Sequence, residues 1–488
     1  MKHLLICLTF VLLAHEVQAG LPIEWSGVFA VDTMRINKYH GAEGVSPTYD
    51  PDSVALDGVS ENAKFQSFIF RLEPKIIVND AATIKGEFSM GPNRGGQLGN
   101  NDTTTAQLAT NGFTHFTRPA TSGSLVANKI YAELYADTAI YRIGRHTKSW
   151  GLGLLFDDGQ DVWDRYLTVY DGIQIDYRIG NFVFTPQWAK INTENLTSQT
   201  DVKETGVSLL YDNKNSNTMG GIYYGSRKAG GANSYYMRLA PGGTDPATDL
   251  NSIGATSLTI IDLYAKKNWE KFSIGAEAIS YTGDVQDPYG TGAPTNSSYK
   301  ASAYIVETSY KLTPTWKLGL NAGHLSGASG DDVGEFGAMY ANPNYQVAYL
   351  MFRYNKMAIE DLNDANSDVF ASSITNANFL KFYADYNAEN WTWKMAMIYA
   401  TAVETAKAGS TYFNHVKGQL SSAAAGVDQK NDLGYEFDFG FDYRWNPSIT
   451  LGGILGYHMT GDYYGFTGAG NLATTNSYIV GLNLGLVF

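Results

Sequence analysis

The sequence is poor in cysteine, proline and charged residues. It contains one cysteine, Cys7, and only 14 prolines among 488 residues, and 17% of its residues are charged. A typical soluble domain carries roughly 25% charged residues, so this chain is poor in charge. A single cysteine cannot form an intramolecular disulfide or a thiolate cluster for a metal ion.

Long hydrophobic runs are also missing beyond the first 20 residues. A helix that crosses a membrane needs about 20 apolar residues in a row, so a protein with several such helices is excluded. The low content of charge and proline argues against disorder. The net charge of −13 disfavours nucleic acid as a partner, because binding it requires cations that neutralise phosphates.

The first 19 residues have the composition of a secretory signal peptide. Lys2 and His3 form a short basic start, and residues 4–14 are mainly apolar. The segment Val17–Ala19 has small residues at its first and third positions, as at the cleavage site of a signal peptide. A first transmembrane helix is the alternative, but the apolar stretch is too short for one. Since the only cysteine falls inside this segment, we expect a mature chain without cysteine.

Apolar and polar residues alternate along most of the remaining chain. Between Tyr435 and Trp445, aromatic residues occupy every second position, and charged residues or glycine lie between them. Such alternation indicates a β-strand with two unlike faces. It occurs in soluble sandwiches, with the apolar face in a core, and in outer-membrane barrels, with the apolar face against lipid.

Three features favour a membrane barrel. The alternating segments span roughly 10–13 residues, close to the 9–11 of a tilted membrane strand and longer than the 5–6 of an ordinary strand. Tyr and Trp lie near strand ends, for example Trp188 and Trp445, as in aromatic girdles. Short and long connections alternate. We therefore expect an all-β antiparallel transmembrane barrel as a single domain over residues 20–488.

Eighteen strands are expected, with short periplasmic turns and long extracellular loops. Their ranges are 24–35, 64–78, 82–90, 126–137, 139–146, 171–179, 181–191, 202–212, 217–227, 256–267, 271–283, 299–312, 315–326, 376–388, 391–403, 433–445, 448–460 and 475–488. The apolar segment Tyr345–Tyr354 would be a nineteenth. Because single-chain barrels have even strand numbers, we assign it to a loop folded into or across the barrel mouth. Sixteen and 20 strands remain alternatives.

The chain resembles Gram-negative outer-membrane porin-like barrels. The resemblance rests on the signal peptide, the alternating segments, the terminal Phe488, and the passage from Arg142–Arg145 to Trp150–Gly153. It implies location in the outer membrane, contact with its lipid and lipopolysaccharide, and recognition of a terminal signal that includes Tyr478 and Phe488 by the barrel-assembly machinery. A homotrimer and a monomer are both compatible with it.

Charged residues on the polar faces suggest how such a lumen would select solutes. Bases cluster on neighbouring strands, and acids cluster on the loop 147–170. The candidate pore-lining residues are Arg71, Lys85, Lys129, Arg142, Arg178, Asp157, Asp158, Asp161 and Asp164. A loop that carries acids opposite a basic wall would create a transverse field at a constriction. The alternative is that these side chains are simply solvated.

These observations predict a channel for passive diffusion of small hydrophilic solutes or ions, narrowed by the loops 147–170 and 327–375. A structural or adhesive barrel with a blocked lumen and a substrate-specific transport channel are the alternatives. The chain contains no H-E-x-x-H or G-x-S-x-G motif. We therefore expect no catalytic residues, no cofactor and no metal site.

Overall fold

A computed structural model describes most of the chain outside its first 20 residues. The described residues are 21–38, 62–90, 94–98, 125–192, 201–229, 256–286, 288–289, 296–353, 372–415, 418–466, 468 and 470–488. The signal peptide expected at residues 1–19 lies outside them.

Eighteen antiparallel strands form a barrel, as the sequence predicted. One sheet contains 20 strands, of which β4 (Gly95–Gln97) and β15 (Glu335–Phe336) are short additions at its side. The barrel strands are β1 (Ile23–Asn37), β2 (Ala63–Asn79), β3 (Ala82–Met90), β5 (Leu125–Tyr135), β6 (Ala139–Thr147), β7 (Val169–Ile179), β8 (Phe182–Asn192), β9 (Val202–Asn213), β10 (Thr218–Ala229), β11 (Thr256–Asn268), β12 (Phe272–Gln286), β13 (Asn296–Lys311), β14 (Trp316–Leu325), β16 (Ala377–Ala388), β17 (Trp391–Ala402), β20 (Asp432–Asn446), β21 (Ile449–Thr460) and β22 (Ser477–Val487).

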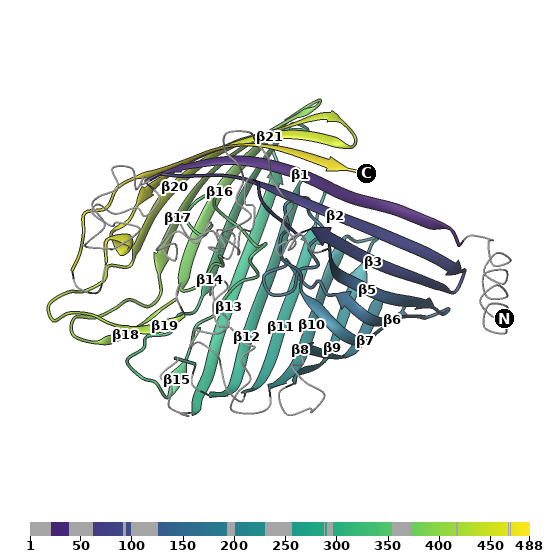
Figure 1. Ribbon diagram of the computed structural model, residues 1–488, viewed down its shortest axis with the longest axis horizontal. Helices are drawn as coiled ribbons and strands as arrows, with labels where there is room; N and C mark the ends of the chain where they lie inside the picture. Colours follow the sequence, from purple (N-terminus) through teal and green to yellow (C-terminus); the bar gives the residue numbers. More distant parts are fainter. Residues whose placement is uncertain are drawn as a thin grey trace, which may run out of the picture.

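The first and last strands close the barrel. β1 pairs with β2 on one side and with β22 on the other, in register from Val28 opposite Val487 to Asn37 opposite Tyr478. In Figure 1 the purple β1 runs beside the yellow C-terminal strand. Closure gives each edge strand a hydrogen-bonded neighbour, which a sheet in hydrocarbon requires.

All short connections lie at one end of the barrel. Strand pairs such as β2–β3, β7–β8 and β20–β21 are joined by two residues, and the other turns have three or four. Gly180, in the turn between β7 and β8, has a φ of +59° that suits glycine. We call this end the turn end and the opposite end the loop end. In barrels of this kind the turns are periplasmic and the loops extracellular.

The two faces of the strands differ as the alternation predicted. Along β20, Phe437 and Phe439 point outward and are 45% and 40% exposed, whereas Glu436 and Asp438 point inward and are 0% and 8% exposed. Apolar side chains therefore cover the outside and charged ones the inside. A soluble sandwich would have the opposite arrangement, so the barrel interpretation holds.

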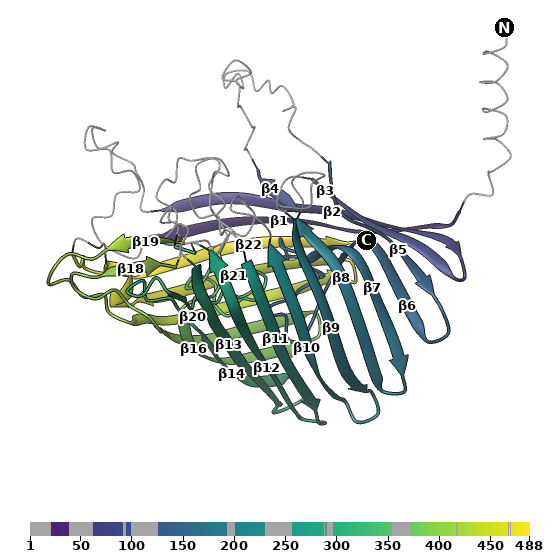
Figure 2. The same ribbon diagram turned by 90° about the horizontal axis from the view of Figure 1, so that it is seen from below.

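The loop end contains more structure than the sequence indicated. The hairpin of β18 (Thr411–Asn414) and β19 (Gln419–Ser422) lies at this end (Figure 2), and a 3-10 helix, η1, spans Asp462–Gly465. Residues 345–353 form no strand, which confirms their assignment to a loop, and Tyr354 at the end of that segment lies outside the described residues. Within the described part of the chain, no helix has the length and apolar character needed to span a membrane.

The outward face of β20 provides a test of the membrane assignment. Phe439 lies midway along the strand, and Tyr435 lies near its loop end. Arginine at the bilayer midplane of a barrel costs about 2–4 kcal/mol, and near an interface about 0–1 kcal/mol. We expect Phe439→Arg to lower the free energy of unfolding in lipid vesicles by the larger amount and Tyr435→Arg by the smaller. Equal losses would contradict the assignment.

Candidate functional site in the barrel lumen

Two loops fold into the barrel. Inner loop 1 comprises residues 148–168 between β6 and β7, and inner loop 2 comprises residues 337–353 after β15. Trp150 of inner loop 1 contacts the inward rings of Tyr223 and Tyr264, with ring centroids 6.3 and 6.4 Å apart. The predicted loop 147–170 therefore reaches the lumen, whereas residues 354–371 of the predicted loop 327–375 lie outside the described residues.

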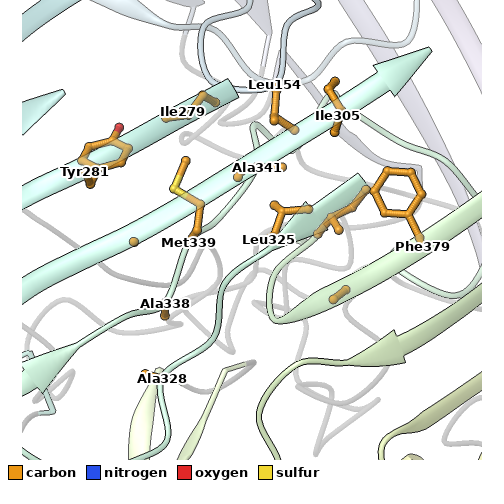
Figure 3. Packing of buried hydrophobic residues seen from close by; sticks show 14 of the residues in the cluster. Leu154, Ile279, Tyr281, Ile305, Leu325, Ala328, Ala338, Met339, Ala341 and Phe379 are labelled. Carbon is orange, nitrogen blue, oxygen red and sulfur yellow. The ribbon is translucent and has the colours of Figure 1, made fainter. Parts of the chain in front are cut away.

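Part of the lumen is filled by an apolar cluster that both loops share with the wall. Leu154 of inner loop 1 and Met339 of inner loop 2 lie among Ile279, Ile305 and Leu325 of β12, β13 and β14 (Figure 3). All five side chains are at most 3% exposed. Burying several such side chains contributes about 1.5–3 kcal/mol each, so this cluster fixes the loops against one side of the barrel.

Arginines of the wall bind the backbone carbonyls of inner loop 1. Arg71 of β2 donates hydrogen bonds to the carbonyl oxygens of Gly159 and Gln160, both at 2.8 Å. Arg94, just before β4, donates to the same Gly159 oxygen at 2.7 Å and to that of Asp164 at 3.0 Å. Guanidinium groups suit this task because several N–H donors diverge from one rigid plane.

Arg94 is itself held by a buried carboxylate. Its Nε and Nη2 donate to the two oxygens of Glu87, each at 2.7 Å. Lys129 also pairs with Glu87, at 2.8 Å. Two cations therefore share one fully buried carboxylate, and this arrangement places Arg94 rigidly against the loop.

Carboxylates of two further wall strands bind backbone N–H groups of the loops. Glu277 of β12 accepts a hydrogen bond from the N–H of Leu152 in inner loop 1. Glu436 of β20 accepts from the N–H groups of Leu350 and Met351 in inner loop 2, at 2.6 and 2.7 Å. Irregular backbone away from water must find such partners, because an unpaired buried N–H is costly.

Two asparagines of inner loop 2 join the loops to each other. The N–H of Asn342 donates to the carbonyl of Leu154 at 2.7 Å. The side-chain amide of Asn344 donates to the Asp157 carboxylate at 2.7 Å and to the carbonyl of Tyr166 at 2.9 Å. Together with the wall contacts, these bonds make a continuous bridge of loop segments across the lumen.

Lys148, at the start of inner loop 1, is enclosed by aromatic rings. Its Nζ lies 3.2 Å from the ring centroid of Tyr223 and 4.1 Å from that of Phe156. The amine has no hydrogen-bond partner among the described residues, and burial lowers its pKa to about 7. Aromatic faces attract the charged form of an amine by cation–π interaction, but only in part offset the loss of water.

Asp164 of inner loop 1 has a raised pKa, whereas the pKa of Lys148 is lowered. Burial, followed by the nearby Asp157 carboxylate, raises the pKa of Asp164 to about 7. Its Oδ2 accepts a hydrogen bond from the N–H of Asp161 at 2.8 Å. Inner loop 1 thus holds both an amine and a carboxyl group that titrate near neutral pH.

Two cavities remain beside the bridge. The first has a volume of about 610 Å³. Its charged lining consists of Lys75, Lys85, Lys129, Arg142, Lys148, Arg178, Glu73, Glu133, Asp158 and Asp176. The second has a volume of about 410 Å³. Its charged lining consists of Asp32, Asp161, Asp164, Asp442, Arg165, Arg353 and Lys394.

Most of the residues expected to line the pore do face these cavities. Lys85, Lys129, Arg142, Arg178 and Asp158 line the first, and Asp161 and Asp164 line the second. Their role in permeation stays a prediction.

Arg71 was also expected to line the pore, but it lines neither of the two cavities. It is only 2% exposed and bonded to the carbonyls of inner loop 1, so it anchors the loop. Asp157 also serves the loop, because its carboxylate accepts hydrogen bonds from Gly159 and Asn344.

The inward faces of the strands carry acids as well as bases, as expected from their alternating polar residues. Wall bases have acids of the wall beside them: Lys85 pairs with Glu133 at 2.6 Å, and Arg142 pairs with the same carboxylate at 2.9 Å. The physical reason is that adjacent inward positions on neighbouring strands bring opposite charges together. The field inside the first cavity therefore comes from a mixed wall as well as from the loop.

Several residues of the site were not recognised from the sequence. Arg94 lies in a segment expected to be an extracellular loop, and Asn342 and Asn344 carry no motif. Glu436 and Asp438 were recognised as part of a polar face, but not as acceptors for backbone N–H groups of inner loop 2, which for Asp438 is the N–H of Tyr349 at 3.2 Å. Since each of these contacts joins segments far apart in the chain, no local pattern could have indicated it.

Chains similar to this protein are found among solved structures. No family model matches the chain, and no curated protein matches it. Among solved structures, the outer membrane protein OpdK from Pseudomonas aeruginosa is 11% identical, with a TM-score of 0.47, over 95% of this chain and 99% of that one. OccAB4 from Acinetobacter baumannii is 11% identical, with a TM-score of 0.46, over 95% and 98%. OmpT of Vibrio cholerae is 8% identical, with a TM-score of 0.40, over 96% and 97%.

The fold is that of an outer-membrane porin-like barrel. The eighteen closed strands and the loops folded into the lumen establish this architecture. At 8–11% identity, the solved structures say nothing of the solute that this barrel handles. Among the described residues, no group of three or more His, Cys, Asp or Glu side chains is placed to hold a metal ion.

The carboxylate of Glu436 should be essential for holding inner loop 2. Glu436→Ala would leave the buried N–H groups of Leu350 and Met351 without a partner, at about 1–3 kcal/mol for each. We expect lower stability against guanidinium and a larger, noisier single-channel current. The control is Glu335→Ala, which removes an exposed ion pair with Lys300 worth about 0–1 kcal/mol. Equal effects of the two variants would contradict the assignment.

Lys148 should make stability depend on pH. Its pKa is about 7 in the folded protein and 10.5 in the unfolded chain. Between these values the unfolded chain binds a proton that the folded protein does not, so this group makes stability rise with pH across that window. We expect the rise in the heat-unfolding midpoint from pH 7 to pH 10 to be smaller in Lys148→Met than in wild type. The exposed Lys311→Met should keep the wild-type rise; a wild-type rise in Lys148→Met would contradict the account.

Proposed function

We propose that this protein is a channel for passive diffusion of small hydrophilic solutes across the outer membrane. The observation that carries the proposal is the pair of charged cavities beside the loop bridge, about 610 and 410 Å³ in volume. Cavities of this size accommodate small molecules, and charged linings keep them filled with water. A barrel that served only as a scaffold would not need charged side chains around open space.

The inner loops would set the size limit of the channel. They occupy the lumen between Arg71 of β2 and Arg94 beside β4 on one hand and the carboxylates of β12 and β20 on the other, so a solute must pass beside them. Wall and loop charges can then replace part of the hydration of a polar solute as it moves. No step of this process requires bond making or breaking, so we propose transport without catalysis.

The first cavity should favour anions. Its lining has six basic and four acidic side chains, although the whole chain carries a net charge of −13. Arg178 is exposed in this cavity and has no ion pair among the described residues. Since a channel selects through the charges along its path, this local excess matters more than the net charge of the chain.

We also propose the remaining features of an exported barrel. These are removal of residues 1–19 as a signal peptide, and recognition of Tyr478 and Phe488 by the barrel-assembly machinery. The backbone of Phe488 exchanges hydrogen bonds of 2.9 and 3.1 Å with Gly27, so the proposed signal lies where the barrel closes. A trimer and a monomer are both compatible with this arrangement.

Planar-bilayer recording tests the proposal. We expect the purified, folded protein to give stable open-channel conductance with a reversal potential on the anion side in a salt gradient. Arg178→Gln should shift this potential toward cations by several millivolts, because it removes an exposed positive charge from the path. Lys271→Gln, at an exposed turn between β11 and β12, is the control and should shift it less. Persistent silence of the folded protein would favour a structural or adhesive barrel with a blocked lumen.

A further inference from the structure

Two cations face outward beside each other on the lipid side of the barrel. Arg35 of β1 and Lys64 of β2 are directly opposite in the strand register, and both side chains are exposed. On its other side Arg35 is opposite Val480 of β22, which is 45% exposed on the outer face. The alternate residues Met34 and Ile36 are buried toward the lumen. These cations therefore cannot belong to the permeation path.

This pair lacks a counter-ion among the described residues. Like charges directly opposite on neighbouring strands repel each other and destabilise the sheet. The same rim shows how the protein itself can relieve such repulsion. Lys190 and Lys203 are also directly opposite, and the carboxylate of Asp201 lies between them, at 2.9 and 3.3 Å from their amines. No described acid pairs with Arg35 or Lys64, so an anion from outside the chain would relieve their repulsion.

A hollow of about 690 Å³ adjoins the pair on the outer surface. Polar Thr33 and Gln66 lie beside the cations in its lining. The apolar part is provided by Leu98, Val480 and Leu482, which are 46%, 45% and 60% exposed. A ligand that fits both parts must have an anionic group joined to hydrocarbon.

The hollow lies at the loop end of the barrel. Arg35 is two residues from the end of β1, and Lys64 is the second residue of β2. Tyr478, also in the lining, follows the first residue of β22, at a level where aromatic residues mark the membrane interface. The cations thus lie at the depth of lipid headgroups in the outer leaflet, and the apolar lining continues toward the acyl chains.

We propose that this hollow binds a phosphorylated glycolipid of the outer leaflet, lipopolysaccharide, with one phosphate held between Arg35 and Lys64 and an acyl chain against Val480 and Leu482. Phosphate is the fitting anion because its several oxygens can accept hydrogen bonds from a guanidinium and an ammonium group together. The site is separate from the lumen and does not depend on the proposed transport function.

Lipid binding to the purified full-length protein tests this site. The probe is fluorescent lipid A, titrated into protein in detergent. We expect Arg35→Gln combined with Lys64→Gln to weaken binding at least tenfold. The matched control is Lys271→Gln with Lys311→Gln, which removes two exposed charges at the turn end and should leave affinity unchanged. Equal affinity of both double variants would overturn the proposal.

Two further arms separate the possible sources of the anion. Dephosphorylated lipid A should bind wild-type protein at least tenfold more weakly than lipid A, a comparison that needs no variant to fold. Inorganic phosphate at millimolar concentration should not displace lipid A. Equal binding of dephosphorylated lipid A would overturn the phosphate contact, and full displacement by phosphate would overturn the lipid site. The variant with Arg35 and Lys64 replaced should have the bilayer conductance of wild type, because both cations lie outside the lumen. A failure of the transport proposal would therefore be recognised separately from a failure of the lipid site.

Discussion

The structure depends on one requirement, which is that backbone polar groups taken into the barrel must find hydrogen-bond partners. Strand pairing meets this requirement for the wall. For the inner loops it is met by charged side chains of the wall, because Arg71 and Arg94 bind carbonyls while Glu277 and Glu436 bind N–H groups. Inward charges that would otherwise serve only as a polar lining thereby determine where the loops lie.

This arrangement explains how the lumen combines a dry part with a wet part. The apolar cluster around Leu154 and Met339 attaches the loops to β12, β13 and β14, and the charged contacts hold their other edges. Two charged cavities are left beside the bridge. Apolar and charged side chains are also separated on the outer face. Cations at the loop end meet the headgroup region, and aromatic and aliphatic side chains meet hydrocarbon.

The strand number, the boundaries within a few residues and the direction of the faces could be predicted because alternation is a local property of the sequence. The even-number rule decided how residues 345–353 should be interpreted, and the structure confirms that choice. The partners of the charged residues could not be predicted. Arg71 is separated from Gly159 by 88 residues and Glu436 from Leu350 by 86, so only the closed barrel brings them together. For this reason the sequence indicated Arg71 only as a pore-lining residue and not as an anchor of inner loop 1.

The central claim is that charged side chains of the wall hold two loops in the lumen and thereby set its aperture. The most direct measurement is the exclusion limit for uncharged polyethylene glycols of increasing size, determined from their effect on single-channel conductance. Wild type should be compared with a variant in which Arg71, Arg94, Glu277 and Glu436 are all replaced by alanine, after its folding is confirmed. The account predicts that the variant admits larger polymers than wild type. The same exclusion limit for both proteins would contradict it.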